Sequence, residues 1–202
     1  MSVPIHPDWV LLEQGLGSRP VLLSSIEEIR EASNHIADNL NPTYPVLNPK
    51  PRIVEERATD SGLRVRVFTP EVATQDPLPV GVYGGWASGS IEAEEATCIH
   101  VAVQVPSIII AVAYRLAPEF KAPAAHNDAV DALIWAWKNV SGLGGDQTRL
   151  FTIGGSAGGN LAISVVLKTL DQEINVTGIV AIVPVTVHPD GVPSKHRSAY
   201  KS

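Results

Sequence analysis

One uninterrupted apolar strand constrains the fold of this chain more than any other feature. Residues 108–113 read Ile-Ile-Ile-Ala-Val-Ala, with no polar side chain at any position. A strand with one face in water would alternate apolar and polar residues, so this strand must be covered on both faces. Strands buried in this way belong to parallel sheets whose two faces are covered by helices.

The segments around this strand alternate between strand and helix patterns. Strand patterns cover residues 78–83, 107–113, 150–153 and 176–185, and helix patterns cover 92–104, 124–140 and 158–170 between them. Because strand, helix and strand in succession form a parallel crossover, we predict an α/β fold with a mostly parallel sheet and helices on both faces. The helix segment 161–167 is apolar almost all round, so we expect it to be central.

The region before residue 51 has a different pattern. Its one helical candidate is 24–30, which Ser24 or Ser25 can cap and whose glutamates suit the positive end of a helix. Prolines in 41–45 then punctuate a connection. We therefore divide the chain into an N-terminal helical or cap segment, residues 1–50, and an α/β core, residues 51–202, which opens with a half-exposed strand around Val65 and Val67.

Composition and charge exclude several classes of function. The 202 residues carry 21 acidic and 15 basic side chains, a net charge of -6 that leaves no electrostatic footprint for nucleic acid. Cys98 is the only cysteine, so no internal disulfide can form, and we expect it to be an apolar filler on a helix. The opening residues lack a secretory signal, and no apolar run approaches the ~20 residues of a membrane span. We therefore expect a cytoplasmic location.

Residues 154–160, Gly-Gly-Ser-Ala-Gly-Gly-Asn, carry the strongest chemical signal. They contain a G-x-S-x-G motif between an apolar strand and an apolar helix, the context of a nucleophile elbow. So sharp a turn strains the backbone and needs small neighbours, while it exposes the Ser156 hydroxyl. The following helix directs its N-terminal amides at the space beside Ser156. The motif predicts Ser156 as nucleophile and the Ala157 amide as the first oxyanion donor.

This turn has two alternative interpretations. Glycine-rich strand-to-helix turns also bind phosphate groups, and such a turn can be merely structural. A dinucleotide site needs G-x-G-x-x-G, but the third position counted from Gly154 is Ser156. The chain also contains no G-x-x-x-x-G-K-[ST] sequence. The nucleophile elbow is therefore the preferred interpretation.

The remaining candidates have structural interpretations. Asp128 and Asp131, near the start of the helix predicted over 124–140, fit solvation or the helix's positive end better than catalysis. Trp135 and Trp137 on that helix are expected to pack in the core. The four histidines before Ser156 lack metal-ligand spacing such as H-E-x-x-H, so we assign no metal site.

Further motifs accompany the elbow in a fixed order along the chain. They are Tyr83-Gly84-Gly85-Trp86 with Gly89-Ser90, Tyr114-Arg115-Leu116-Ala117-Pro118-Glu119, Pro123-Ala124-Ala125 with Asp128-Ala129, and 154–160. In their order and spacing over residues 50–190, these motifs resemble those of the hormone-sensitive-lipase-like carboxylesterases, which have the α/β-hydrolase fold. Segments 1–20 and 184–189 look most similar to fungal members, such as the versiconal hemiacetal acetate esterases of secondary metabolism.

This resemblance implies a serine esterase that needs no cofactor and no metal. Its substrate would be a small-molecule ester with a short or medium acyl group, such as an acetate. Ser156 would attack the ester, and the amides of Gly84, Gly85 and Ala157 would bind the oxyanion. The family's usual His-Gly-Gly-Gly is shortened here to Gly84-Gly85, directly after Tyr83.

The rest of the catalytic triad has no clear counterpart in the sequence. In this fold the acid and the histidine follow the serine, and in this family both lie after further strands. His188 and His196 are the only histidines after Ser156, and neither segment is similar to that of the family's catalytic histidine. His188 remains an alternative base, because its strand is expected beside the one that ends at Ser156.

We therefore expect a hydrolase core truncated after about the sixth strand. The alternative function is that of an inactive esterase-like protein, which at most binds ligands or pairs with another chain. The last strand, 176–185, is apolar without a charged residue, so we expect it to promote self-association through its free edge.

Overall fold

A computed structural model describes residues 25–40, 51–72, 76–84 and 90–186, together with 10, 14, 191 and 193–195. Its elements are α2 (Ile26–Leu40), β1 (Pro51–Ala58), β2 (Arg64–Pro70), β3 (Leu78–Tyr83), α3 (Glu95–Gln104), β4 (Ile108–Val112), α4 (Ala124–Asn139), the 3-10 helix η2 (Val140–Leu143), β5 (Gly145–Gly155), α5 (Ala157–Lys168) and β6 (Val176–Ile182).

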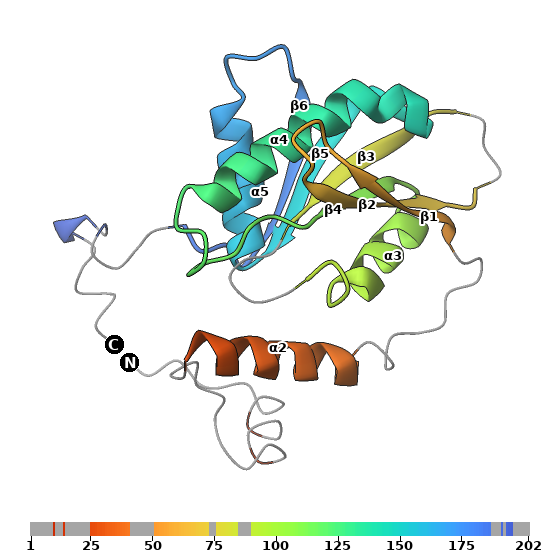
Figure 1. Ribbon diagram of the computed structural model, residues 1–202. Helices are drawn as coiled ribbons and strands as arrows, with labels where there is room; N and C mark the ends of the chain where they lie inside the picture. Colours follow the sequence, from red (N-terminus) through yellow and green to blue (C-terminus); the bar gives the residue numbers. More distant parts are fainter. Residues whose placement is uncertain are drawn as a thin grey trace.

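The described strands form one sheet in the order β1-β2-β4-β3-β5-β6. The four strands from β4 to β6 are parallel neighbours, whereas β1 and β2 pair antiparallel at one side. Helix α3 packs on one face of the sheet, and α4 and α5 pack on the other (Figure 1). The predicted α/β fold, with a mostly parallel sheet and helices on both faces, is confirmed.

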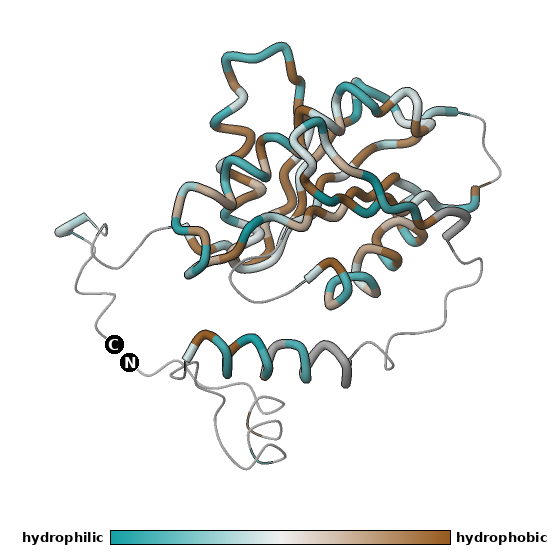
Figure 2. Tube along the Cα trace, viewed as in Figure 1, coloured by the Kyte–Doolittle hydropathy of each residue, from teal (hydrophilic) through white to brown (hydrophobic). Residues whose placement is uncertain are grey.

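Strand β4 lies in the middle of the core and is buried on both faces. Ile109 belongs to the apolar cluster under α3, while Ile108 and Ile110 belong to the larger cluster under α4 and α5. Burying one such side chain contributes about 1.5–3 kcal/mol, so β4 alone accounts for a sizeable part of the core. Hydrophobic residues accordingly concentrate along the central strands in Figure 2.

Other packing predictions are confirmed. Cys98 is fully buried on α3, where burial raises the pKa of its thiol. Trp135 is buried in the core beside α4's other apolar residues, and Trp137 packs against the same cluster.

Among the described residues, no helix is both long and apolar enough to cross a membrane.

The surroundings of Asp128 differ from the sequence-based expectation, and one strand was not predicted. Asp128 is not solvated but buried, where its carboxylate accepts hydrogen bonds from the Arg115 guanidinium and main-chain amide. Asp131 accepts hydrogen bonds from Thr59 and Ser61. Strand β1 was not predicted, because its sequence is rich in charged residues.

Helix α5 is less central than its apolar sequence indicates. Leu161 and Val165 are buried against the sheet, but Leu167 is 63% exposed. The helix covers β5 and β6 at one side of the sheet, and Leu167 is not part of the apolar cluster beneath it. A helix that is apolar all round therefore leaves one apolar stripe exposed here.

Helix α2 stands apart from the sheet and begins as the sequence predicts (Figure 1). The Ser25 hydroxyl accepts a hydrogen bond from the Glu28 amide at 3.3 Å, and the Glu28 carboxylate accepts one from the Ser25 amide at 3.0 Å. This reciprocal pair is a capping box, so the predicted Ser25 cap is confirmed. The helix continues to Leu40, well beyond the predicted 24–30.

Candidate active site

The topology of the sheet brings the predicted nucleophile and the predicted oxyanion glycines to one place. Strands β3 and β5 are parallel neighbours, yet the helices that follow them, α3 and α5, lie on opposite faces. Where crossovers leave a parallel sheet on opposite faces, a crevice opens at the carboxyl ends of the strands, and ligands bind there. Gly84 follows β3 directly and Ser156 follows β5 directly.

Ser156 adopts a backbone conformation that side chains rarely adopt. Its φ is 53° and its ψ is −114°, and the residue is exposed although Ala157, which follows, is buried. A non-glycine residue in such a region costs on the order of 1–3 kcal/mol and persists only where its surroundings enforce it. The sharp, strained turn inferred from the motif is therefore present between β5 and α5.

Close packing explains two glycines of the 154–160 segment, Gly154 and Gly159. A Cβ atom on Gly154 would lie 2.4 Å from the carbonyl carbon and oxygen of Gly158 and 2.7 Å from the carbonyl oxygen of Gly84. On Gly159, a Cβ atom would lie 3.0 Å from the Cβ of Pro184. These glycines let the end of β5, the first turn of α5 and the strand ends on both sides approach at main-chain distance.

The main chain of Ser156 is bonded on both sides. Its amide donates to the carbonyl oxygen of Ile182 at 2.8 Å. Its carbonyl oxygen accepts hydrogen bonds from the amides of Asn160 at 3.2 Å and Val185 at 3.1 Å. Two of these three partners come from the end of β6 and the segment after it, a contact that the motif alone did not indicate.

The predicted oxyanion donors differ in their surroundings. Ala157 is the first residue of α5, and amides of the first turn have no acceptor within their own helix. The partial positive charge of the helix end adds to the pull of that amide on an anion. The Gly84 amide donates to the carbonyl oxygen of Ile153 at 3.3 Å, which places Gly84 beside the end of β5. Gly85 lies outside the described residues.

The histidines considered as bases are not among the described residues, since both His188 and His196 lie outside them. His126, which the sequence analysis set aside, lies near the site instead. Its Nε2 is 3.1 Å from the Oδ1 of Asn160, a residue in the first turn of α5. Within the described part of the chain, no group of three or more histidine, cysteine or acidic side chains could hold a metal ion.

A cleft of about 170 Å³ opens beside Gly84, at the carboxyl ends of β3 and β4. Its wall is mostly apolar, and Ser156 is not among its lining residues. Within the wall, the Tyr83 hydroxyl donates a hydrogen bond to the Glu94 carboxylate at 2.6 Å. Arg64, at its rim, donates to Glu92 at 2.9 Å, and this bond lowers the pKa of Glu92 to about 2.

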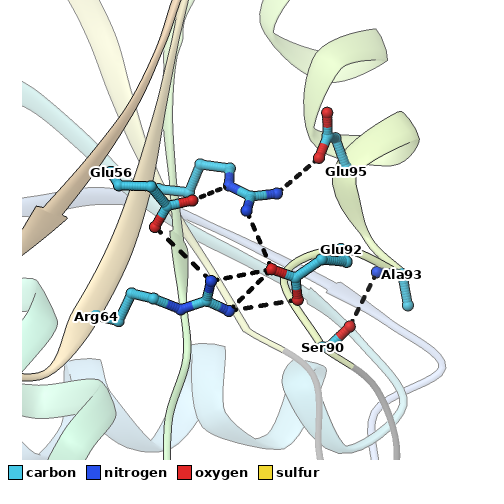
Figure 3. A network of polar contacts seen from close by, with 7 residues as sticks. Glu56, Arg64, Ser90, Glu92, Ala93 and Glu95 are labelled. Atoms are coloured by element: carbon cyan, nitrogen blue, oxygen red, sulfur yellow. Dashed lines mark hydrogen bonds and ion pairs between the residues drawn. The ribbon is translucent and has the colours of Figure 1, made fainter.

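That ion pair belongs to a charged network that joins β1, β2 and the start of α3 (Figure 3). Arg66 donates to Glu95 at 2.6 Å and to Glu92 at 3.0 Å, and it also bonds to Glu56. Arg64, Arg66, Glu56 and Glu92 each have more than one partner of opposite charge, and Glu95 pairs with Arg66. The network therefore fixes one wall of the cleft.

Comparison with known proteins identifies the family of this chain. A profile of the α/β-hydrolase fold matches residues 83–202. The chain belongs to the α/β-hydrolase fold family. This match begins at the last residue of β3 and includes Gly84, β5, the turn at Ser156 and α5.

Several relatives of this α/β-hydrolase chain are esterases. The versiconal hemiacetal acetate esterase of Aspergillus parasiticus is 34% identical over 99% of this chain and 64% of that enzyme. The arylesterase of Saccharolobus solfataricus is 35% identical over 78% of this chain and 51% of that enzyme. The hyperthermophilic esterase of the archaeon Pyrobaculum calidifontis superposes with a TM-score of 0.81 at 30% identity, over 99% of this chain and 65% of that one.

These matches confirm the resemblance to the hormone-sensitive-lipase-like carboxylesterases that the motifs indicated. The chain spans less than two thirds of the length of each of these three relatives.

Proposed function

We propose that this chain carries the nucleophile and part of the oxyanion hole of a serine carboxylic-ester hydrolase. The observation that carries the proposal is the strained backbone of Ser156, a non-glycine residue with φ 53°, at the N-terminus of α5. Strained backbone of this kind clusters at active sites, which supports a catalytic role for Ser156. The position of Ser156 at the opening between β3 and β5 supports the same assignment.

In the proposed reaction, the Ser156 Oγ attacks the carbonyl carbon of the ester while a general base takes the hydroxyl proton. The amide of Ala157 then donates to the oxyanion of the tetrahedral intermediate, with Gly84 and Gly85 as further donors. For that role Gly84 must release the carbonyl oxygen of Ile153. Collapse of the intermediate expels the alcohol, and water hydrolyses the acyl group from Oγ.

The substrate class we propose is a small-molecule ester with a short or medium acyl group. Support comes from the names of two relatives, an acetate esterase and an arylesterase. The cleft of about 170 Å³ beside Gly84 has a mostly apolar wall, which suits an apolar part of such an ester. No step of the proposed reaction requires a cofactor.

A fluorophosphonate probe tests the nucleophile directly, because phosphorus replaces the ester carbonyl and fluoride leaves as the Oγ–P bond forms. In a full-length enzyme that supplies the general base as well as this chain, we expect labelling of Ser156, mapped by peptide mass, and its loss in Ser156→Ala. Ser164→Ala on the same helix is the matched control, since the Ser164 hydroxyl donates only to the main chain of Leu161. Labelling that survives in Ser156→Ala would refute the assignment.

A second candidate function is that of an esterase-like protein without turnover, which binds ligands or pairs with another chain. The observation that favours it is the lack of a recognisable triad acid and histidine after Ser156. Losing the base can cost up to ~10⁶ in kcat. We therefore expect the 202-residue chain to hydrolyse p-nitrophenyl acetate at close to the background rate.

The same assay decides whether His188 serves as a base. Turnover at the rate of ordinary esterases, abolished by His188→Ala, would identify a dyad with Ser156 and would exclude the second candidate. An unchanged rate in His188→Ala would leave His188 outside the reaction.

A further inference from the structure

Among the described residues, the two non-glycine residues with positive φ are Ser156 and Val183, and both are exposed. Val183 has a φ of 42°, which is costlier for a β-branched residue than for serine. Val183 lies in the 182–185 turn, which follows β6 and bonds to Ser156 from both of its ends. The two strained residues are therefore parts of one arrangement.

The bonds between the turn and Ser156 show what the strain at Val183 achieves. The carbonyl of Ile182 accepts from the Ser156 amide, and three residues later the Val185 amide donates to the Ser156 carbonyl. A straight continuation of β6 would place residue 184 opposite the Ser156 carbonyl, but residue 184 is proline and has no amide proton, while the Val185 amide would lie one residue further along. The bend at Val183 thus brings both bonds to Ser156.

The side chain of Asn160 closes this arrangement. Its Nδ2 donates to the carbonyl oxygen of Val185 at 2.7 Å, so Val185 is bonded through both its amide and its carbonyl. Its Oδ1 lies 3.1 Å from the Nε2 of His126 on α4. Because Nδ2 is committed to a carbonyl, Oδ1 acts as acceptor and His126 donates through Nε2.

We propose that Asn160 is a positioning residue that locks the 182–185 turn onto the nucleophile turn and so holds Ser156 in its strained conformation, with His126 as its outer support. Asn160 acts on Ser156 through Val185. The proposal deepens the proposed function and rests on it for its catalytic consequence. The local order that Asn160 imposes can be measured without any chemistry at Ser156.

The sharpest test is Asn160→Asp, which keeps the size of the side chain and an acceptor for His126. It replaces the donor to Val185 by a carboxylate oxygen facing a carbonyl oxygen. We expect the amide protons of Ser156 and Val185 to exchange with solvent at least about tenfold faster at pH 7, consistent with a lost hydrogen bond plus repulsion. We expect fluorophosphonate labelling of Ser156 to slow by a similar factor.

Asn139→Asp is the matched control. Asn139 also donates from Nδ2 to a main-chain carbonyl, that of Trp135, at 2.8 Å. It lies thirteen residues after His126 on the same helix, or about 20 Å along the axis. We expect its exchange rates at Ser156 and Val185, and its labelling rate, to stay within about twofold of the unaltered chain.

A pH series separates positioning from a general loss of stability. A protonated carboxyl has an O–H that can donate to Val185 as the amide did. The exchange ratio between Asn160→Asp and the unaltered chain should therefore fall as the pH drops below about 4, near the ordinary pKa of aspartate. A variant weakened only in overall stability would show no such recovery.

The outcomes separate the two proposals. If Asn160→Asp leaves exchange at both amides unchanged, or if Asn139→Asp has the same effect, the positioning role is wrong even where Ser156 is labelled normally. If exchange accelerates but a full-length enzyme that supplies the general base is never labelled at Ser156, the positioning role stands and the nucleophile proposal fails. Should Asn160→Asp not fold, His126→Ala must accelerate the same two amides about threefold, and no change there would overturn the proposal.

Discussion

Gly154 faces main-chain atoms on two sides, those of Gly158 in helix α5 and those of Gly84 after β3. Main-chain atoms cannot turn away as the end of a flexible side chain can. Gly155, the next residue, has no heavy atom within 4 Å of the position that its Cβ would take. Two adjacent glycines of one motif therefore differ. Close packing requires glycine at position 154, whereas neither packing nor a positive φ requires it at position 155.

We expect Gly154→Ala to lower the free energy of unfolding by about 1–3 kcal/mol or more, because the added methyl overlaps backbone and the turn must shift. The matched variant Gly155→Ala should stay within about 0.5 kcal/mol of the unaltered chain. Urea denaturation followed by circular dichroism measures both. Equal losses in the two variants would show that the close approach at Gly154 is not what limits the turn.

At this scale the sequence predicts what is local and misses what is long-range. The G-x-S-x-G motif predicts the strained turn at Ser156 because the constraint is contained in five consecutive residues. The bonds from Asn160 to Val185 and to His126 could not be predicted, because they depend on where β6 ends and how α4 packs beside α5. The burial of Asp128 was missed for the same reason, since its partner Arg115 lies in the loop before α4.

Among the elements, α2 joins the rest of the structure through a charged contact. Arg30 donates to both carboxylate oxygens of Glu119 at 2.7 Å and to the carbonyl oxygen of Ala117 at 2.6 Å. The Glu119 segment follows β4 and also carries the Arg115 ring contact with Phe120. The capping of α2 was predictable from consecutive residues, but a contact across 89 positions was not.

The contact between α2 and Glu119 should be lost in acid. Hydrogen bonds from Arg30 lower the pKa of Glu119 from its ordinary 4.5 to about 2. A lowered pKa means that the contribution is fully present above about pH 4.5 and is lost as the pH falls towards 2. Hydrogen exchange of α2 amides, corrected for intrinsic rates, should therefore show loss of protection across that window.

Glu119→Gln removes the charge at every pH and is the control for this prediction. Its α2 amides should be less protected than those of the unaltered chain at pH 7, and acid should change them little further. If the unaltered chain keeps its protection at pH 2, the Arg30–Glu119 pair does not hold α2 in place.

For the molecule as a whole, the alternation of strand and helix patterns was enough to predict the class of fold. Parallel crossovers and the uniformly apolar β4 are both features of a sheet that helices cover on its two faces. The antiparallel addition of β1 and β2 was not predicted as a pair, since the charged residues of β1 conceal a strand pattern. Those charges are informative once the strand order is known. Strand β1, which contains Arg52, Glu55, Glu56 and Arg57, is one outer strand of the described sheet.

The other outer strand of the described sheet, β6, has the opposite composition. Its sequence, Val-Thr-Gly-Ile-Val-Ala-Ile, contains no charge and no proline, and Ile179, Val180 and Ile182 are exposed. Exposed Leu167 and Leu170, on and just after α5, extend the apolar surface of this part of the molecule. Charged residues and prolines are the usual means by which an outer strand avoids pairing with another chain, and β1 has both whereas β6 has neither.

We therefore expect the isolated 202-residue protein to self-associate through β6, seen as an apparent mass in light scattering that rises with concentration. Val180→Lys introduces a charge on the exposed strand and should shift the protein towards a monomer. Val54→Lys, at an exposed position on the already charged β1, is the matched control and should change the mass little. A monodisperse monomer that melts cooperatively without any substitution would show that the free edge of β6 does not recruit a second copy, because the fold then tolerates this edge in water.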